Sequence, residues 1–285
     1  MKTPSASVFR HKEDIVPTAI FCALFLIDIA VYMSSDSIPF LGMWTLLCLA
    51  PKACICSWNH HHQHVHTFHS TLLNRLLELV YSCHTGITTN AWVLHHNLGH
   101  HVNYLDQTKD ESGWMRKDGT TMGVAEYTAV IAITGYIRAF MVGLKHPKYL
   151  KGFFQGGLIT LLFVGTLTYL RPVPALIVFL IPMVTGYVIT CWHTYYHHAD
   201  LHSDNHFEAS YNIMHKWYNL LTGNLGYHTA HHSKQGLHWS KLPELHESIK
   251  HKIPLHLYRE PSIPFKWLPA GDYIVENNTK IEAAL

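Results

Sequence analysis

Four long apolar segments constrain the fold of this chain more than any other feature of its sequence. They cover residues 15–33, 38–58, 153–170 and 173–192. A stretch of about 20 apolar residues is long enough for a helix to cross the hydrocarbon core of a bilayer. Within each successive pair, only a short turn separates the two segments. The sequence therefore predicts two transmembrane hairpins.

The composition agrees with a membrane protein. Charged residues make up 14% of the 285 residues and apolar residues 48%, whereas a soluble domain contains about 25% charged residues. The net charge is only +2, and no basic stretch alternates with aromatic residues, so no nucleic acid partner is expected. The six cysteines include no CxxC pair, which favours reduced thiols over a disulfide framework or a zinc ribbon.

Two further apolar segments, 72–80 and 122–144, contain charged side chains. We expect both to be helices that lie at the membrane interface; a fifth span is the alternative for 122–144. The predicted fold class is all-α integral membrane, with four transmembrane helices in two hairpins, interfacial helices and a cytoplasmic histidine-rich cap. We expect residues 1–285 to form a single membrane domain.

The basic residues predict the orientation of the spans. Lys2, Arg10 and Lys12 precede the first span, whereas the SSDS turn that follows it has no Lys or Arg. The turn between the last two spans has only Arg171 as a basic residue. Because cytoplasmic loops carry the excess of Lys and Arg, we expect a multi-pass protein with both termini and both histidine-rich blocks in the cytoplasm.

Histidine is the most common potentially basic residue type in the chain, with 26 His against 21 Lys and Arg together. Eleven of them lie in residues 60–101 and ten in residues 193–238, so each block follows the second arm of a hairpin. A neutral imidazole offers a lone pair to a metal. Two histidines four apart on a helix share a face and can bind one ion.

The histidines form ordered boxes with metal-ligand spacing. HHHQH contains an HxxxH pair at His60 and His64, and HNLGHH gives HxxxHH from residue 96 to residue 101. HTAHH gives HxxHH from residue 228 to residue 232, and YYHHADL places a histidine pair directly after the last span. One HxxxH alone is weak evidence for a metal, but three ordered boxes at the ends of membrane hairpins favour a metal centre.

This arrangement resembles the integral-membrane fatty acid desaturase and hydroxylase superfamily, which is a non-haem di-iron group. The resemblance covers nearly the whole chain, because the box order and the four spans both match. The final block, NLGYHTAHHSKQGLHWSKLPELH, is especially similar to bacterial members, including the run with His238, Trp239 and Pro243. The resemblance implies two iron ions as cofactors and O2 as co-substrate.

The resemblance also implies which histidines bind the irons. In the family the second histidine of the first box is commonly followed ten residues later by Asn or Asp, and here Asn74 follows His64 at that spacing. This favours the 60/64 pair, although His62 and His66 also make HxxxH and remain an alternative. The implied ligands are His60, His64, His96, His100, His101, His198, His228, His231 and His232.

The ligand after the last span stays open among three residues. His198 occupies the family position, but His197 stands where the family has Gln or Glu, and His193 makes HxxxHH with the pair. Four carboxylates lie near the boxes and could orient imidazole N–H groups. They are Asp106, Asp110, Glu111 and Asp200.

The implied function is a fatty acyl desaturase that uses O2 and electrons to introduce a double bond, with an acetylenase that makes triple bonds also allowed. The acyl chain could be carried by coenzyme A, an acyl carrier protein or a glycerolipid. A hydroxylase or ketolase of alkanes, sterols or carotenoids is the alternative, because the boxes do not separate these outcomes. A membrane metal transporter is a remote alternative, since the four spans contain no histidine and one acidic residue, Asp28.

The chain contains no recognisable electron-transfer motif. His146 and Pro147 continue as Lys-Tyr rather than as a haem-binding HPGG, there is no CxxC pair for a rubredoxin, and no glycine-rich dinucleotide fingerprint is present. We therefore expect a separate electron donor such as a ferredoxin, a rubredoxin or a cytochrome.

Overall fold

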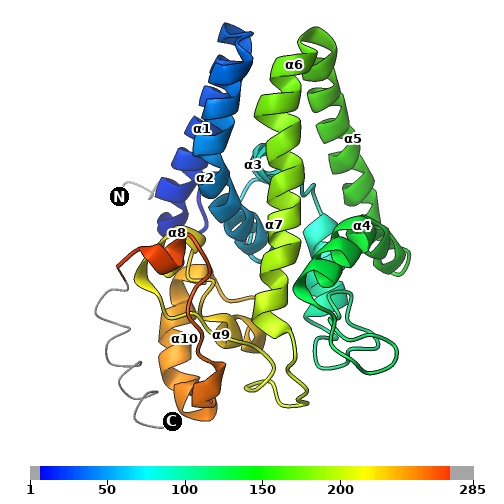
Figure 1. The fold of residues 1–285 in the computed structure, drawn as a ribbon, viewed down its shortest axis with the longest axis vertical. Helices are drawn as coiled ribbons and strands as arrows, with labels where there is room; N and C mark the ends of the chain where they lie inside the picture. The colour runs from blue at the N-terminus through cyan, green and yellow to red at the C-terminus, as the bar shows by residue number, and fades with distance from the viewer. Residues whose placement is uncertain (1–6, 270–285) are drawn as a thin grey trace, which may run out of the picture. The chain divides into compact units, whose positions relative to one another are not determined.

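The computed structural model describes residues 7–269. Within them all regular elements are helical, and β structure is confined to three isolated bridges. The α-helices are α1 Ile15–Ser34, α2 Ile38–His64, α3 Thr71–Thr85, α4 Val124–Gly143, α5 Pro147–Leu170, α6 Pro172–Ala175, α7 Ile181–His198, α8 Lys216–Thr222, α9 His228–Ser233 and α10 Leu242–Ile249 (Figure 1). Two π-helices are η2 Val93–His100 and η3 Leu176–Leu180. The short 3₁₀ helices are η1 Lys12–Asp14, η4 Trp239–Lys241, η5 Lys250–Lys252, η6 Leu255–Leu257 and η7 Phe265–Trp267.

Four helical segments are long and apolar enough to cross a membrane, which confirms the predicted spans. They are Lys12–Ser34, Ile38–His64, Pro147–Leu170 and Pro172–His198. Helix α4 is not among them, so within residues 7–269 nothing supports a fifth span. The spans extend further than the apolar runs alone indicated, and the first histidine box therefore lies on the last turns of α2. The chain is a multi-pass membrane protein.

The chain forms two compact units, each made from two separate stretches. Unit 1 contains the residues up to Asn90 together with Lys148–Gly186, and unit 2 contains Ala91–Pro147 together with the residues from Tyr187 onward. Helix α7 begins in unit 1 and continues into unit 2. The single domain over residues 1–285 stays a prediction, and Lys2 lies outside the described residues.

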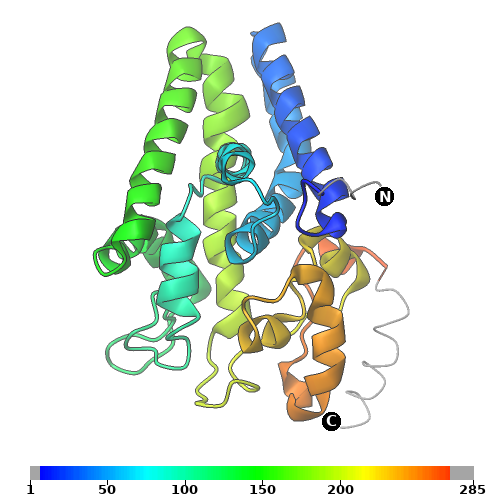
Figure 2. The same cartoon turned by 180° about the vertical axis from the view of Figure 1, so that it is seen from behind.

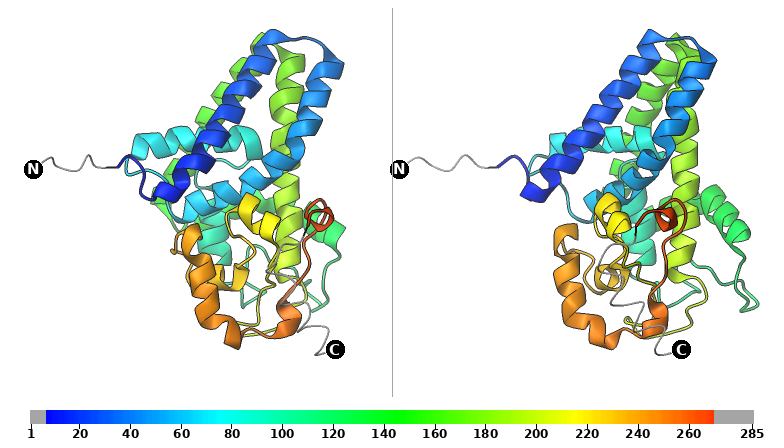
Figure 3. Two further views of the ribbon diagram at one scale, coloured as in Figure 1. Left: turned by 90° about the vertical axis from the view of Figure 1, so that its left-hand side faces the viewer. Right: turned by 60° about the vertical axis from the view of Figure 1, so that its left-hand side comes forward.

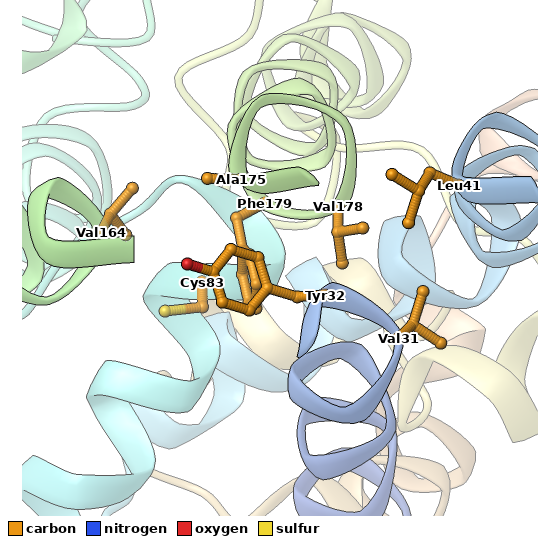
Figure 4. Close-up of a cluster of buried hydrophobic side chains, with 8 residues drawn as sticks. All are labelled: Val31, Tyr32, Leu41, Cys83, Val164, Ala175, Val178 and Phe179. Atoms are coloured by element: carbon orange, nitrogen blue, oxygen red, sulfur yellow. The ribbon is translucent and has the colours of Figure 1, made fainter. Parts of the chain in front are cut away.

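In unit 1, helices α1 and α2 form an antiparallel hairpin closed by a short turn (Figure 3). Its apolar side chains pack with α3, α5, α6 and η3 around Tyr32 and Phe179, whose rings are 5.9 Å apart (Figure 4). The Tyr32 hydroxyl donates to the Leu167 carbonyl at 2.7 Å. In a membrane each buried polar group needs such an internal partner.

A charged pair lies inside the first hairpin. Asp28 of α1 accepts a hydrogen bond from Trp44 Nε1 at 2.9 Å and lies 2.8 Å from Lys52 Nζ. Both charged side chains are almost fully buried. Lys52 follows Pro51, and α2 continues through this proline. The pair neutralises two charges that would be strongly unfavourable alone in a bilayer.

Helix α3 crosses the direction of the spans. Figure 2 views α3 almost end-on, whereas α1 and α5 run lengthwise. The helix begins after Ser70, whose hydroxyl caps the Leu73 amide at 3.4 Å. It ends at Gly86, which has φ +69° and whose added Cβ would lie 2.3 Å from the Met183 carbonyl oxygen. Only glycine fits this close approach. The structure confirms a helix here, while its place at the membrane interface stays a prediction.

Unit 2 has two packed regions. The first surrounds Trp114, which precedes α4, and Tyr127, which lies in α4. It also includes Cys191 of α7. The second lies near the C-terminal end of the described chain, where Asn212 and Tyr258 form a bridge. Helix η2 packs along α4, and α9 lies beside α10. Helices η2 and α9 and the part of α7 from Tyr187 onward carry most of the box histidines, and all three belong to unit 2.

Candidate metal centre

The second histidine box lies on a π-helix, not on an α-helix. In η2 the amide of His101 donates to the carbonyl of His96 at 2.8 Å, which is a bond across five residues. This wider turn brings together residues five apart, His96 and His101, both of which belong to the predicted box. The Nε2 atoms of His96 and His101 are 3.0 Å apart. π-turns of this kind occur frequently at functional sites.

His231 of α9 completes the first group of imidazoles in unit 2. Its Nε2 atom lies 3.0 Å from Nε2 of His101. The ring of His231 is nearly parallel to that of His96, with centroids 6.2 Å apart. The ligand atoms of His96, His101 and His231 all lie within 4.8 Å of one another. Three nitrogen donors from two elements therefore converge on one point.

A second group forms around His198, the last residue of α7. Nε2 of His198 lies 3.2 Å from Nε2 of His100 and 3.0 Å from Nε2 of His228. The ligand atom of His232 also lies within 4.8 Å of those of His100 and His198. The side chains of this group are buried. Four imidazoles from η2, α7 and α9 therefore lie in contact with one another.

The pattern of nitrogen contacts fits a bound cation better than a hydrogen-bond network. An imidazole nitrogen carries either one N–H or one lone pair, yet Nε2 of His101 faces two other Nε2 atoms, and so does Nε2 of His198. Within residues 7–269 neither ring nitrogen of the buried His232 has a hydrogen-bond partner. A buried unsatisfied nitrogen costs about 1–3 kcal/mol. A metal ion at each group would satisfy these donors.

Burial favours the neutral form of His232, which is the form that a metal requires. Burial is the main cause that lowers the pKa of His232 well below its ordinary value, and the neighbouring His198 and His228 lower it further. Burial likewise lowers the pKa of the neighbouring His95 to about 4. A neutral imidazole keeps the lone pair that binds a metal.

Two hydrogen bonds orient the rings of the second group. Nδ1 of His100 lies 2.8 Å from Oδ1 of the buried Asp110, which also accepts from the Ser112 amide at 2.8 Å. Nδ1 of His198 donates to the Ala209 carbonyl at 2.9 Å. A carbonyl oxygen only accepts, so His198 carries its proton on Nδ1 and its Nε2 lone pair is available. Such partners fix the tautomer and orientation of metal-binding histidines.

The sequence predicts four carboxylates as candidates for orienting the imidazoles. Of these, Asp110 makes a hydrogen-bond contact with a box histidine, His100. Asp106 pairs with Lys109 at 2.6 Å, and Glu111 lies 3.8 Å from Arg138. Asp200 accepts from the Thr121 hydroxyl at 2.8 Å.

The first histidine block, in unit 1, divides into two groups. His60 and His64 have their Nε2 atoms 3.1 Å apart. His62 and His66 instead lie with Glu78 of α3, and Nε2 of His62 is 3.5 Å from Oε1 of Glu78. The two pairs that the sequence left open therefore have different surroundings.

The three histidines at the end of α7 differ in the same way. His193 and His197 contact the Tyr218 hydroxyl through Nε2, at 3.2 and 3.3 Å. The His197 ring also stacks on His228 with centroids 3.9 Å apart. His198 alone of the three has its Nε2 among the grouped nitrogens described above.

Sequence reasoning missed one aromatic residue of this centre. The ring of Tyr104 lies 4.3 Å from that of His232, measured between centroids. Its hydroxyl is 2.6 Å from Nδ1 of His206. Tyr104 follows His101 by three residues, a spacing that can place two side chains on the same side of a helix. The segment after η2 is irregular, however, so no helical periodicity in the sequence indicated that the two rings lie at the same centre.

One comparison with known proteins gives a result over most of the chain. A family profile described as "Fatty acid desaturase" matches residues 37–264. The match includes all the histidine boxes and begins just before α2. No curated protein and no solved structure matches the chain.

Proposed function

Because the chain belongs to the fatty acid desaturase family, we propose that it introduces a double bond into a fatty acyl chain, using O2, two electrons and two histidine-bound irons. Membership makes it an oxidoreductase of a non-haem iron type. The observation that carries the finer proposal is the convergence of seven buried or partly buried imidazoles in unit 2 on two groups of nitrogen atoms.

The proposed ligands are those that the resemblance implies. In unit 2, one ion would be held by His96, His101 and His231, and the other by His100, His198, His228 and His232. The pair His60 and His64 of unit 1 is proposed to complete the set, supported by the 3.1 Å separation of its Nε2 atoms. All-nitrogen donors suit several first-row metals, so iron is supported by the family rather than by ligand type.

Iron, when bound, supplies the O2-dependent oxidising power that side chains lack. The chain itself orients and shields the site. Asp110 holds His100, and the Ala209 carbonyl holds His198, each with Nε2 directed toward the group. The buried imidazoles exclude bulk water, which protects a reactive centre from side reactions.

An acyl chain is the proposed substrate because the protein lies in the bilayer and the family acts on fatty acids. Removal of two hydrogens requires two adjacent carbons to stay fixed beside the metals. A small displacement of the chain after the first hydrogen abstraction would change whether a second hydrogen is removed or oxygen is transferred. Experiment will identify the acyl carrier, which is coenzyme A, an acyl carrier protein or a glycerolipid. Experiment will also show whether the product is an alkene or an alkyne. A separate ferredoxin, rubredoxin or cytochrome is the proposed electron donor.

The test uses the full-length protein, purified in lipid nanodiscs and supplied with an electron donor, acyl substrates and isotopically labelled dioxygen. We expect two irons per chain and a product lighter by two hydrogens, with the label recovered in water. A single metal per chain, or zinc as the active metal, would contradict the ligand proposal. Label retained in the lipid as the main product would identify a hydroxylase instead.

A further inference from the structure

A third group of side chains could hold a metal ion and includes none of the proposed iron ligands. It consists of His62 on α2, His66 just after that helix, and Glu78 on α3, whose ligand atoms lie within 4.8 Å of one another. We propose that these three residues form a separate zinc site in unit 1. The site uses none of the nine proposed iron ligands, so it does not depend on the proposed function.

Helix geometry separates this group from the first histidine box. Successive residues of an α-helix turn by about 100°, so residues two apart lie about 200° apart around the axis. His62 therefore lies on the opposite side of α2 from His60. In the structure, His60 faces His64, whereas His62 faces α3.

The distance between His62 and Glu78 fits a shared metal better than a shared proton. Nε2 of His62 lies 3.5 Å from Oε1 of Glu78, and both side chains are 1% exposed. A charge-assisted N–H···O bond is about 2.7–2.9 Å long. Two ligand atoms that are each about 2.0–2.2 Å from a tetrahedral ion lie roughly 3.3–3.6 Å apart. In the part of the chain that the structure describes, neither atom has a hydrogen-bond partner.

The carboxylate is held with one oxygen directed at the site. Oε2 of Glu78 accepts from Arg75 Nη1 at 2.5 Å and from the Thr89 hydroxyl at 2.6 Å, which leaves Oε1 toward His62. The positive charge of Arg75, which lies 2.5 Å from Oε2, favours the ionised carboxylate. The ionised carboxylate is the form that binds a metal.

The imidazole of His62 is oriented from its other side. Its Nδ1 atom accepts a hydrogen bond from the Thr67 amide at 3.3 Å and lies 2.9 Å from the Thr67 hydroxyl. Zinc binding through Nε2 requires the ring proton to move to Nδ1, where the Thr67 hydroxyl is close enough to accept it. A partner on the far side of the ring then holds the orientation of the metal-binding histidine.

His66 supplies the third donor from the segment between α2 and α3. Its ring centroid is 5.3 Å from that of His62, and the side chain is partly exposed. A water molecule can therefore occupy a fourth position. Two histidines, one carboxylate and one water form a common ligand set for zinc. Zinc bound here ties the α2–α3 connection to α3, directly beside the turn that carries His60 and His64.

The experiment measures zinc binding by the iron-loaded full chain in nanodiscs after loosely bound metal is removed with a mild chelator. We expect one zinc per chain in addition to the iron. Co²⁺ as a substitute probe should give the visible absorption of a four-coordinate ion. The variants His66→Ala and Glu78→Gln should weaken zinc binding by about 100-fold or more and abolish the cobalt spectrum, with iron content unchanged.

His69→Ala is the matched control, because His69 belongs to the same connection and is exposed; it should bind zinc as the parent does. His66→Ala decides the outcome if Glu78→Gln fails to fold, since His66 is partly exposed. If the wild-type protein binds no additional zinc, the proposal is wrong. His62 and Glu78 would then form only a proton-bridged His–Glu pair. Loss of iron from His66→Ala would also overturn it, because the group would then belong to the iron site.

Discussion

Nε2 of His101 lies 3.0 Å from Nε2 of His96, although the two residues are five positions apart in the chain. In an α-helix that separation leaves two side chains about 140° apart around the axis. The π-turn of η2 brings them together and directs His100, between them, toward His198. One helical turn thus supplies donors to both nitrogen groups of unit 2.

Replacement of any one of the nine proposed ligands by Ala should remove most activity and lower bound iron, because a lost ligand disturbs both ions. His101→Ala is the most informative case, since its Nε2 contacts two other donors. Iron analysis and product assays would measure this. His146→Ala and His251→Ala, outside the boxes, should keep parental iron and activity; a similar loss in these controls would indicate general misfolding.

Asp110→Asn should lower activity by about 10–100-fold and weaken iron retention, because the amide holds the His100 ring less firmly than a carboxylate does. Asp106→Asn is the control, since Asp106 is a partly exposed carboxylate of the same loop that pairs with Lys109. Iron release to a chelator would be timed for both. Equal release rates in the two variants would mean that the Asp110 contact does not orient a ligand.

The stability of the protein should depend on pH partly through His246. Burial is the main cause that lowers the pKa of this side chain to about 4, whereas an unfolded histidine has a pKa near 6.5. Below pH 6.5 the unfolded chain gains a proton that the folded chain does not, so stability falls as pH falls toward 4. The loss is about 1.4 kcal/mol per pH unit. Melting curves of His246→Phe should show a smaller decrease than the parent between pH 7.5 and 5.5; parallel curves would remove this explanation.

The buried Asp28–Lys52 pair should contribute to stability only as a pair. Lys52→Met removes the positively charged partner of Asp28 and should destabilise the protein by about 3–5 kcal/mol. Asp28→Leu combined with Lys52→Met should recover much of that loss, because no uncompensated charge remains. Thermal unfolding in nanodiscs measures both. A double variant no more stable than Lys52→Met would show that the pair has no such coupling.

The sequence predicted the parts of the protein that depend on local pattern. Hydropathy located the four spans, and the first box could be narrowed to two pairs, of which His60 and His64 face each other. The π-turn of η2 has no sequence periodicity of its own, so nothing in the sequence indicated that His96 lies next to His101 while His100 faces His198. Glu78 was read as a charge on an interfacial helix, because its burial depends on Arg75, Thr89 and α2, which come together only in the folded unit.

The orientation of the protein can be tested with reporter fusions along the chain. Arg10 precedes the first span and Lys12 is its first residue, and cytoplasmic loops carry the excess of basic residues. Fusions after Asp36 and Arg171 should therefore report an external position, and fusions after Glu111 and Leu285 a cytoplasmic one. The fusion at Glu111 is decisive, because this residue follows the second box by ten residues and precedes the third span. An external signal there would separate the first two boxes from the cytoplasmic electron donors and exclude the proposed topology.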